Sequence, residues 1–284
     1  MISMLFSHLL ALVISSSYVG SLYIVGKIQP GSRDQPAVIR ARLSAVTITS
    51  TLSCAVVYFL IASSNLDHPF EVTMSTLLLF LGPLYTRHLA YILPGQNKPS
   101  LIHELGMLCT WLGFRNYVWA PLTEEIVFRA CVLAVYAMGG AARWKMIAFA
   151  PLVFGLAHVH HGWEVFTRFG RTKAAFKRAA ISALFQTAYT TLFGAHASFL
   201  FLRTSSLVPP LIAHIFCNTM GLPQPGVELK RFPAHKKSII TAYVLGILLF
   251  AGTLVPWTEV PARMASLYWS SPADFWILLR QRRY

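Results

Sequence analysis

Long apolar runs separated by short polar loops dominate the chain. The runs cover residues 4–26, 43–62, 72–93, 121–138, 145–161, 179–202, 205–222 and 238–255. Several of them approach or exceed the roughly 20 apolar residues that a helix needs to cross a bilayer. They are far too long for the strands of a membrane barrel. The pattern therefore predicts an all-α, polytopic membrane protein with about eight transmembrane helices, and we expect residues 1–284 to form one domain.

Three stretches complicate this pattern. The first run could also be a cleavable signal peptide, but no positive residue precedes it and it exceeds the usual length of such a segment. Gly82-Pro83 should kink the third run. Residues 103–119 are mixed in character and predict an interfacial or half-buried helix whose depth stays open. After them, Pro121 suits the first turn of a new helix, and Thr123 is an alternative N-cap.

Charge is scarce and unevenly placed. Only 12% of the 284 residues are charged, about half the share of a soluble domain, and Lys+Arg 24 against Asp+Glu 10 gives a net charge of +14. In a soluble protein that excess could indicate nucleic-acid binding. Here the basic residues gather in loops 27–42, 162–178 and 223–237, which is the positive-inside pattern. We therefore expect a lipid bilayer and no nucleic acid as partner.

The same loops predict an orientation. If they lie in the cytosol and residues 103–119 do not cross, the start of run 121–138 and the end of run 145–161 meet at the cytosolic boundary. The arginines at the end of the tail disagree with this count, so the side of the tail stays open. The four cysteines are scattered without a CxxC motif, which predicts neither a disulfide framework nor a zinc ribbon.

The first polar cluster is Glu124, Glu125 and Arg129. A helix that starts at Pro121 or Thr123 places both glutamates in its first turn, where the helix dipole favours negative charge. Glu125 and Arg129 are four residues apart and can pair on one face. Glu124 is turned by about 100° and should be free. The cluster is either a structural ion pair at a helix end or a catalytic carboxylate oriented by its neighbours.

Two further polar clusters lie on separate runs. His158 follows Phe154-Gly-Leu-Ala, and His214-Ile-Phe-Cys-Asn218 places a histidine and an asparagine on one helical face. Intramembrane ionisable residues are functional-site candidates and normally face the bundle interior. Taken singly, each residue can also serve as a hydrogen bond between helices. His160 and His161 fit interfacial positions better.

Together the three clusters suit hydrolysis. A carboxylate and an imidazole can take the proton of a water that attacks a carbonyl carbon. A second imidazole and an amide N–H can then donate to the oxyanion that forms. Two histidines and a glutamate could instead hold zinc, although no His-Glu-x-x-His is present. A proton-relaying transporter is a further alternative, which the lack of internal repeats disfavours.

These motifs resemble those of the type II CAAX prenyl endopeptidases, within the wider group of CAAX proteases and bacteriocin-processing enzymes. The family signature is Glu-Glu-x-x-x-Arg, then Phe-x-x-x-His, then His-x-x-x-Asn or Asp. All three are intact here and in that order. The stretch that begins at Arg115, the His160-His161 pair and Ser32-Arg-Asp-Gln-Pro-Ala-Val-Ile39 are similar to the eukaryotic branch. The resemblance covers roughly residues 32–222, with a motif core at about 103–222.

The resemblance implies a multi-pass protease of the endoplasmic reticulum membrane whose active site faces the cytosol. It implies that prenylated proteins with a C-terminal CAAX sequence are cut after the prenyl-cysteine, which releases the last three residues. In that scheme Glu124 and His158 activate water, Glu125 and Arg129 support them, and His214 and Asn218 stabilise the oxyanion. It implies no cofactor and no catalytic metal, although a metalloprotease assignment has been argued. A related membrane protease with another peptide substrate, or a zinc-dependent variant of the same hydrolysis, remains the alternative.

Overall fold

The computed structural model describes residues 3–60, 70–90, 93, 106–107, 109–258, 266 and 268–269. Within these residues the chain forms helices joined by short turns and contains no strand. The predicted all-α class is therefore confirmed. The beginning of the predicted interfacial helix, at residues 103–105, and the arginines at the end of the tail lie outside the described residues.

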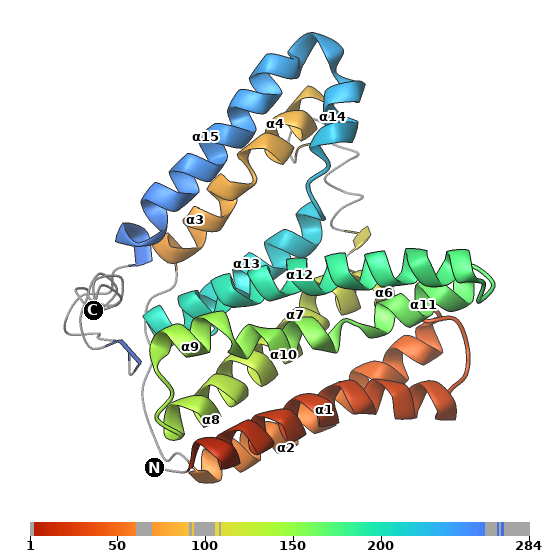
Figure 1. Ribbon diagram of the computed structural model, residues 1–284, viewed down its shortest axis with the longest axis vertical. Coiled ribbons are helices and arrows are strands. Elements are labelled where there is room, and N and C mark those ends of the chain that lie inside the picture. The colour runs from red at the N-terminus through yellow and green to blue at the C-terminus, as the bar shows by residue number, and fades with distance from the viewer. Residues whose placement is uncertain are drawn as a thin grey trace.

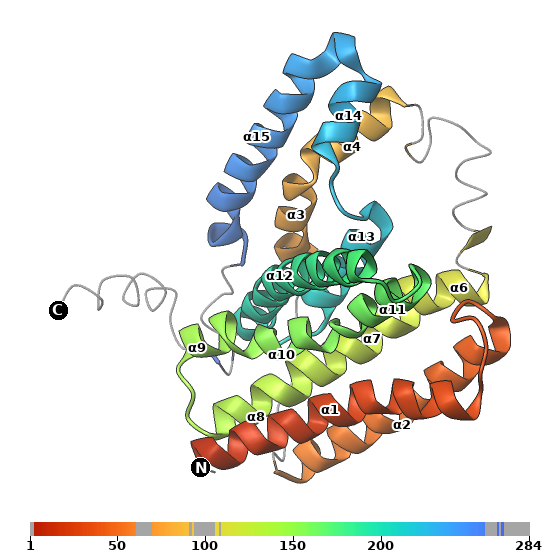
Figure 2. The same ribbon diagram turned by 45° about the vertical axis from the view of Figure 1, so that its right-hand side comes forward.

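The helices form three groups (Figure 1). The helices α1 (Met4–Ile28) and α2 (Pro36–Leu60) pack side by side on one side of the molecule. On the opposite side, α15 (Lys236–Leu254) packs along α3 (Phe70–Leu79) and α4 (Leu81–Leu89). The remaining long helices lie between these two groups, and the turned view preserves this order (Figure 2).

The middle group carries the predicted motifs. Its elements are α6 (Trp111–Phe114), η1 (Arg115–Trp119), α7 (Ala120–Glu125), η2 (Ile126–Cys131), α8 (Val132–Met138), α9 (Arg143–Ala148), α10 (Ala150–Ala157), α11 (His160–Arg168), α12 (Lys173–Thr204) and α13 (Val208–Met220). Three short elements flank α15: α14 (Pro225–Arg231), η3 (Pro233–His235) and η4 (Pro256–Thr258).

Apolar side chains cover much of the outer surface. On α1, Leu5 is 70% exposed and Ile24 62%, and on α12 Leu184 reaches 74%. Contiguous exposed apolar surface of this kind is unusual for a soluble monomer and is expected of a protein surrounded by lipid. Two segments of the described chain, Met4–Ile28 and Pro233–Leu254, are by themselves long and apolar enough to cross a membrane. The count of about eight spans stays a prediction.

Prolines break two of the predicted runs. The third run is divided into α3 and α4 at Phe80, just before Gly82-Pro83, so the predicted kink is confirmed. The fifth run was expected to be one helix over residues 145–161, and this is wrong. It is divided into α9 and α10 at Phe149, and α10 ends at the turn of His158 and Val159. Pro151 explains the break, because it has no N–H to continue the hydrogen bonding of α9.

The motif helix starts earlier than its sequence predicts. One continuous helix covers residues 111–138, and its N-cap is Thr110, whose hydroxyl accepts a hydrogen bond from the Gly113 N–H at 3.0 Å. The predicted start at Pro121 or Thr123 is wrong, since the Thr123 hydroxyl donates to the Trp119 carbonyl inside the helix. Glu124 and Glu125 therefore lie in the middle of the helix, where the dipole of its N-terminus does not reach them.

Close packing fixes the motif helix against its neighbours. Tyr18 of α1 is buried, and its hydroxyl lies 3.0 Å from the Thr123 hydroxyl. On the other side, α10 and α12 approach closely at Gly155, where a Cβ would overlap Thr191 Oγ1 and stand 2.9 Å from the Thr187 carbonyl oxygen. These contacts join α1 to the motif helix and α10 to α12, and so fix helices that carry or surround the predicted site residues.

Candidate active site

Glu125 lies at the centre of a buried polar group. Its carboxylate is buried, and it contacts a guanidinium and an imidazole. Oε2 lies 3.1 Å from Arg129 Nε, and Oε1 lies 2.7 Å from Nδ1 of His214. The predicted i, i+4 pair of Glu125 and Arg129 is therefore confirmed. The same carboxylate also joins the motif helix to α13.

Aromatic rings enclose the buried guanidinium of Arg129. Its Cζ lies 4.5 Å from the ring centroid of Phe154 and 5.7 Å from that of Phe193. Both are within the range of a cation–π contact. Among the described residues, its Nη1 and Nη2 have no hydrogen-bond partner. The ion pair with Glu125 and the two rings are therefore what stabilises this charge.

His214 lies between two carboxylates. While Nδ1 is bound to Glu125, Nε2 lies 3.7 Å from Glu124 Oε2. The sequence predicts that Glu124 is unpaired, but it lies within ion-pair distance of His214. The Glu124 side chain keeps 18% of its surface exposed, whereas that of Glu125 keeps 1%. Glu124 is thus the more accessible of the two carboxylates.

His158 is held by its own helix. It caps the C-terminus of α10, and its Nδ1 lies 2.8 Å from the Phe154 carbonyl oxygen. A carbonyl oxygen only accepts hydrogen bonds, so Nδ1 carries the proton and the lone pair of the neutral ring is on Nε2. The Phe154 ring packs edge-on against His158 at 4.7 Å and against His214 at 6.3 Å, between ring centroids. His158 therefore presents a proton-accepting nitrogen beside His214.

Asn218 makes a bond that its sequence position did not predict. Its Nδ2 donates to the Asn116 carbonyl oxygen at 2.9 Å, which ties α13 to η1. That bond uses one of the two amide hydrogens, and the second stays available to a ligand. Asn218 is exposed, in contrast to the buried His214 one turn before it.

One cavity brings these residues together. It has a volume of about 270 Å³ and is lined by His158, His214 and Asn218, with apolar walls that include Phe185, Phe193 and Leu222. Three of the four predicted catalytic residues thus face a common space, and Glu124 adjoins it through His214. A few polar groups in a mostly apolar cavity are typical of a binding site.

The comparisons with known proteins agree with this site. The family model "Type II CAAX prenyl endopeptidase Rce1-like" matches residues 106–220. The chain is 33% identical over 252 residues to the probable CAAX prenyl protease 2 of Schizosaccharomyces pombe, covering 86% of this chain and 90% of that protein. It is 35% identical to the human CAAX prenyl protease 2, covering 87% of this chain and 80% of that protein. The chain belongs to the type II CAAX prenyl endopeptidases.

As a member of this family, the protein is a peptidase. The CAAX prenyl protease 2 of Saccharomyces cerevisiae is a further relative, 30% identical over 260 residues. All three predicted motifs lie within the matched residues 106–220. No solved structure matches the chain.

Sequence reasoning missed one part of this endopeptidase, a group of charged residues beside the site. Arg33, in the turn between α1 and α2, lies with its Nη1 3.1 Å from Glu164 Oε2 on α11. Next to it, Asp34 Oδ1 lies 3.1 Å from Arg115 Nη1 on η1. The hydrogen bond with His161 and the charge of Arg33 lower the pKa of Glu164 to about 2. The sequence did contain a signal for this group, because Arg33 and Asp34 lie in a stretch that resembles the eukaryotic branch of the family.

Proposed function

We propose that this endopeptidase removes the C-terminal tripeptide of prenylated CAAX proteins, at the membrane of the endoplasmic reticulum and from the cytosolic side. Its relatives are named CAAX prenyl protease 2, and the basic loops of the chain support a cytosolic orientation. The apolar walls of the 270 Å³ cavity suit a peptide that carries a lipid.

In the proposed mechanism, Glu124 and the Nε2 lone pair of His158 take a proton from a water molecule. The water oxygen attacks the carbonyl carbon of the prenyl-cysteine, and the proton passes to the amine nitrogen of the next residue as the C–N bond breaks. The hydrogen bond from His158 Nδ1 to the Phe154 carbonyl supports this role, because it leaves Nε2 free to accept.

His214 and Asn218 would stabilise the oxyanion. Nδ1 of His214 donates to Glu125, so a second ring proton at Nε2 would make His214 a charged donor between two carboxylates. Asn218 would contribute the amide hydrogen that Asn116 does not use. Glu125 and Arg129 would act by holding His214 in place. No step requires a metal or a cofactor.

The observation that carries this proposal is the contact between Glu125 and His214. These residues are 89 positions apart, yet they come within 2.7 Å inside the protein. A charged residue and a histidine brought together at this depth incur a desolvation penalty, and such groups in membrane proteins usually serve function. The contact joins the first and third motifs, and His158 of the second motif lines the same cavity as His214.

The test is tripeptide release from a farnesylated CAAX peptide by the purified full chain in liposomes, followed by mass spectrometry. We expect Glu124→Gln and His158→Ala to reduce kcat by about 10²–10⁴-fold. His214→Ala should reduce it by about 10²–10³-fold. Glu228→Gln is the matched control, because Glu228 contacts Tyr243 away from the site. Full activity in the three site variants, with normal folding, would refute the roles.

An unprenylated peptide of the same sequence distinguishes the proposed function from the main alternative. If it is cleaved as fast as the farnesylated peptide, the protein is a related membrane protease with another substrate. Activity that is lost on chelation and restored by zinc would favour the zinc-dependent variant.

A further inference from the structure

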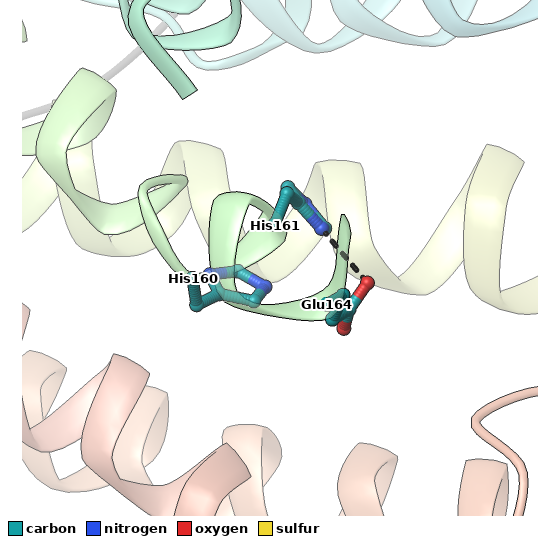
Figure 3. A group of neighbouring side chains, drawn as sticks. All are labelled: His160, His161 and Glu164. Carbon is teal, nitrogen blue, oxygen red and sulfur yellow. Dashed lines mark hydrogen bonds and ion pairs between the residues drawn. The ribbon is translucent and has the colours of Figure 1, made fainter. Parts of the chain in front are cut away.

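A second group of histidines lies outside the catalytic motifs, at the start of α11. His160, His161 and Glu164 gather there on one side of the helix (Figure 3). One ligand atom from each of the three side chains can be chosen so that all lie within 4.8 Å of one another. The sequence favoured an interfacial position for the two histidines and gave Glu164 no role.

The histidine rings are arranged as metal-binding histidines are. His160 Nδ1 donates to the Ala157 carbonyl oxygen at 2.8 Å, which leaves the lone pair of the neutral ring on Nε2. A hydrogen bond of this kind on the second ring nitrogen is the usual support of a histidine ligand. The His160 and His161 rings lie 4.0 Å apart, between centroids. Two imidazoles and a carboxylate are the donor set that zinc prefers.

The guanidinium of Arg33 already contacts this group. Arg33 Nη1 lies 3.1 Å from Glu164 Oε2 and 3.4 Å from His161 Nδ1. A guanidinium nitrogen only donates, so the Glu164 carboxylate accepts from Arg33, and His161 Nδ1 lies 3.3 Å from the same Oε2. A neutral His161 that donates to this carboxylate from Nδ1 has its lone pair on Nε2, as His160 has. The side chain of Arg33 is 42% exposed, whereas those of His161 and Glu164 are 27% and 34% exposed. Arg33 can therefore move into solvent at small energetic cost.

We propose that His160, His161 and Glu164 form a binding site for a divalent transition-metal ion of the zinc type, in which the ion displaces Arg33 from Glu164. The fourth position of a tetrahedral ion would be open to water. The site is separate from the Glu124, Glu125 and His214 group. It is nonetheless close to it, because the rings of His158 and His161 lie 5.9 Å apart between centroids.

The test is direct metal binding by the chelator-treated full chain in detergent. Zn²⁺ is titrated calorimetrically, and Co²⁺ is used as a spectroscopic probe of the ligand set. We expect one ion per chain with two imidazole ligands. His160→Ala and His161→Ala should each weaken binding by at least about tenfold, and Glu164→Gln should weaken it too. His235→Ala is the matched control, because it removes an exposed histidine on η3 and should leave the affinity unchanged.

Arg33→Gln separates a metal site from a simple ion pair. Without the competing guanidinium we expect Zn²⁺ to bind more tightly than it binds to the wild type. Weaker binding in Arg33→Gln, or wild-type affinity in both histidine variants, would overturn the proposal. Loss of binding in His214→Gln with retained binding in His160→Ala would place the ion in the catalytic group and would also overturn it. Thermal unfolding without metal checks that each variant is folded.

Discussion

Glu125→Gln is the most informative single substitution, because it changes the charge of the buried group and keeps its shape. At the 3.1 Å separation of Arg129 Nε and Glu125 Oε2, Coulomb's law with an effective dielectric constant of about 20 gives an attraction of about 5 kcal/mol. The substitution also removes the desolvation penalty of the buried Glu125 carboxylate, which offsets part of the lost attraction. Removing one member of a buried pair leaves the other charge unpaired, which destabilises proteins by about 3–5 kcal/mol. We expect Glu125→Gln to lose stability in that range.

The same substitution should reduce activity for a separate reason. His214 Nδ1 would donate to a neutral amide oxygen instead of a carboxylate, and charge-assisted hydrogen bonds are roughly twice as strong as neutral ones. The imidazole would then be held less firmly in the orientation that lets Nε2 face the substrate. We expect kcat for the farnesylated peptide to fall by about 10²-fold, as for the loss of an oxyanion donor.

The double variant Glu125→Gln/Arg129→Met separates these two effects. It removes both charges, so no unpaired cation remains among the rings of Phe154 and Phe193. Much of the cost of breaking a buried ion pair comes from the charge that is left without a partner, and this variant leaves none. Stability should therefore return toward that of the wild type, while activity stays low because His214 still lacks its carboxylate.

The assays are thermal unfolding of the detergent-solubilised chain, followed by tryptophan fluorescence, and the rate of tripeptide release. Glu228→Gln again serves as the control. Wild-type thermal stability in Glu125→Gln would refute the energetic argument. A double variant as unstable as Glu125→Gln would refute it as well. If the double variant instead recovered full activity, Glu125 would support the fold alone and would not position His214.

Four further outcomes follow from the geometry. His158→Ala should lower kcat for tripeptide release while thermal stability changes little, because its hydrogen bond goes to a carbonyl of its own helix; a large drop in Tm would contradict this. Asn218→Ala should lower the free energy of unfolding by about 0.5–1.5 kcal/mol, the usual net contribution of one hydrogen bond, because this bond to the Asn116 carbonyl is exposed to solvent. In thermal unfolding, Gly155→Ala should cost about 1–3 kcal/mol by overpacking. Gly20→Ala, where nothing lies within 4 Å of the added Cβ, should be neutral or stabilising.

Local physics explains why parts of this structure follow from the sequence. The pairing of Glu125 with Arg129 depends only on helical geometry, which fixes the neighbours of a side chain four residues away. The break before Gly82-Pro83 depends only on the missing N–H of proline. The long apolar runs determine the all-α class because lipid leaves no other way to satisfy so many backbone groups.

Contacts between distant segments could not be obtained in this way. The sequence placed Glu125 in support of Glu124 and His158, whereas the structure joins its carboxylate to His214. That choice depends on how α13 packs against the motif helix, about which spacing within one helix says nothing. The contact of Arg33 with Glu164 spans 131 positions and depends on the turn between α1 and α2. Both contacts are decided by tertiary packing.

The wrong prediction of where the motif helix starts came from Pro121. Proline suits the first turn of a helix because the N–H that it lacks would have no partner there. In this structure Pro121 instead lies in the middle of a helix, just after the π segment η1. In η1 the bonding follows the π pattern, in which the Ala120 N–H reaches the Arg115 carbonyl. The next bond would run from residue 121 to Asn116, and proline cannot make it. Asn218 fills the vacant carbonyl instead. The π segment thus leaves a carbonyl through which α13, and with it His214, is bonded to the helix that carries both glutamates. Irregular segments of this kind are frequent at functional sites.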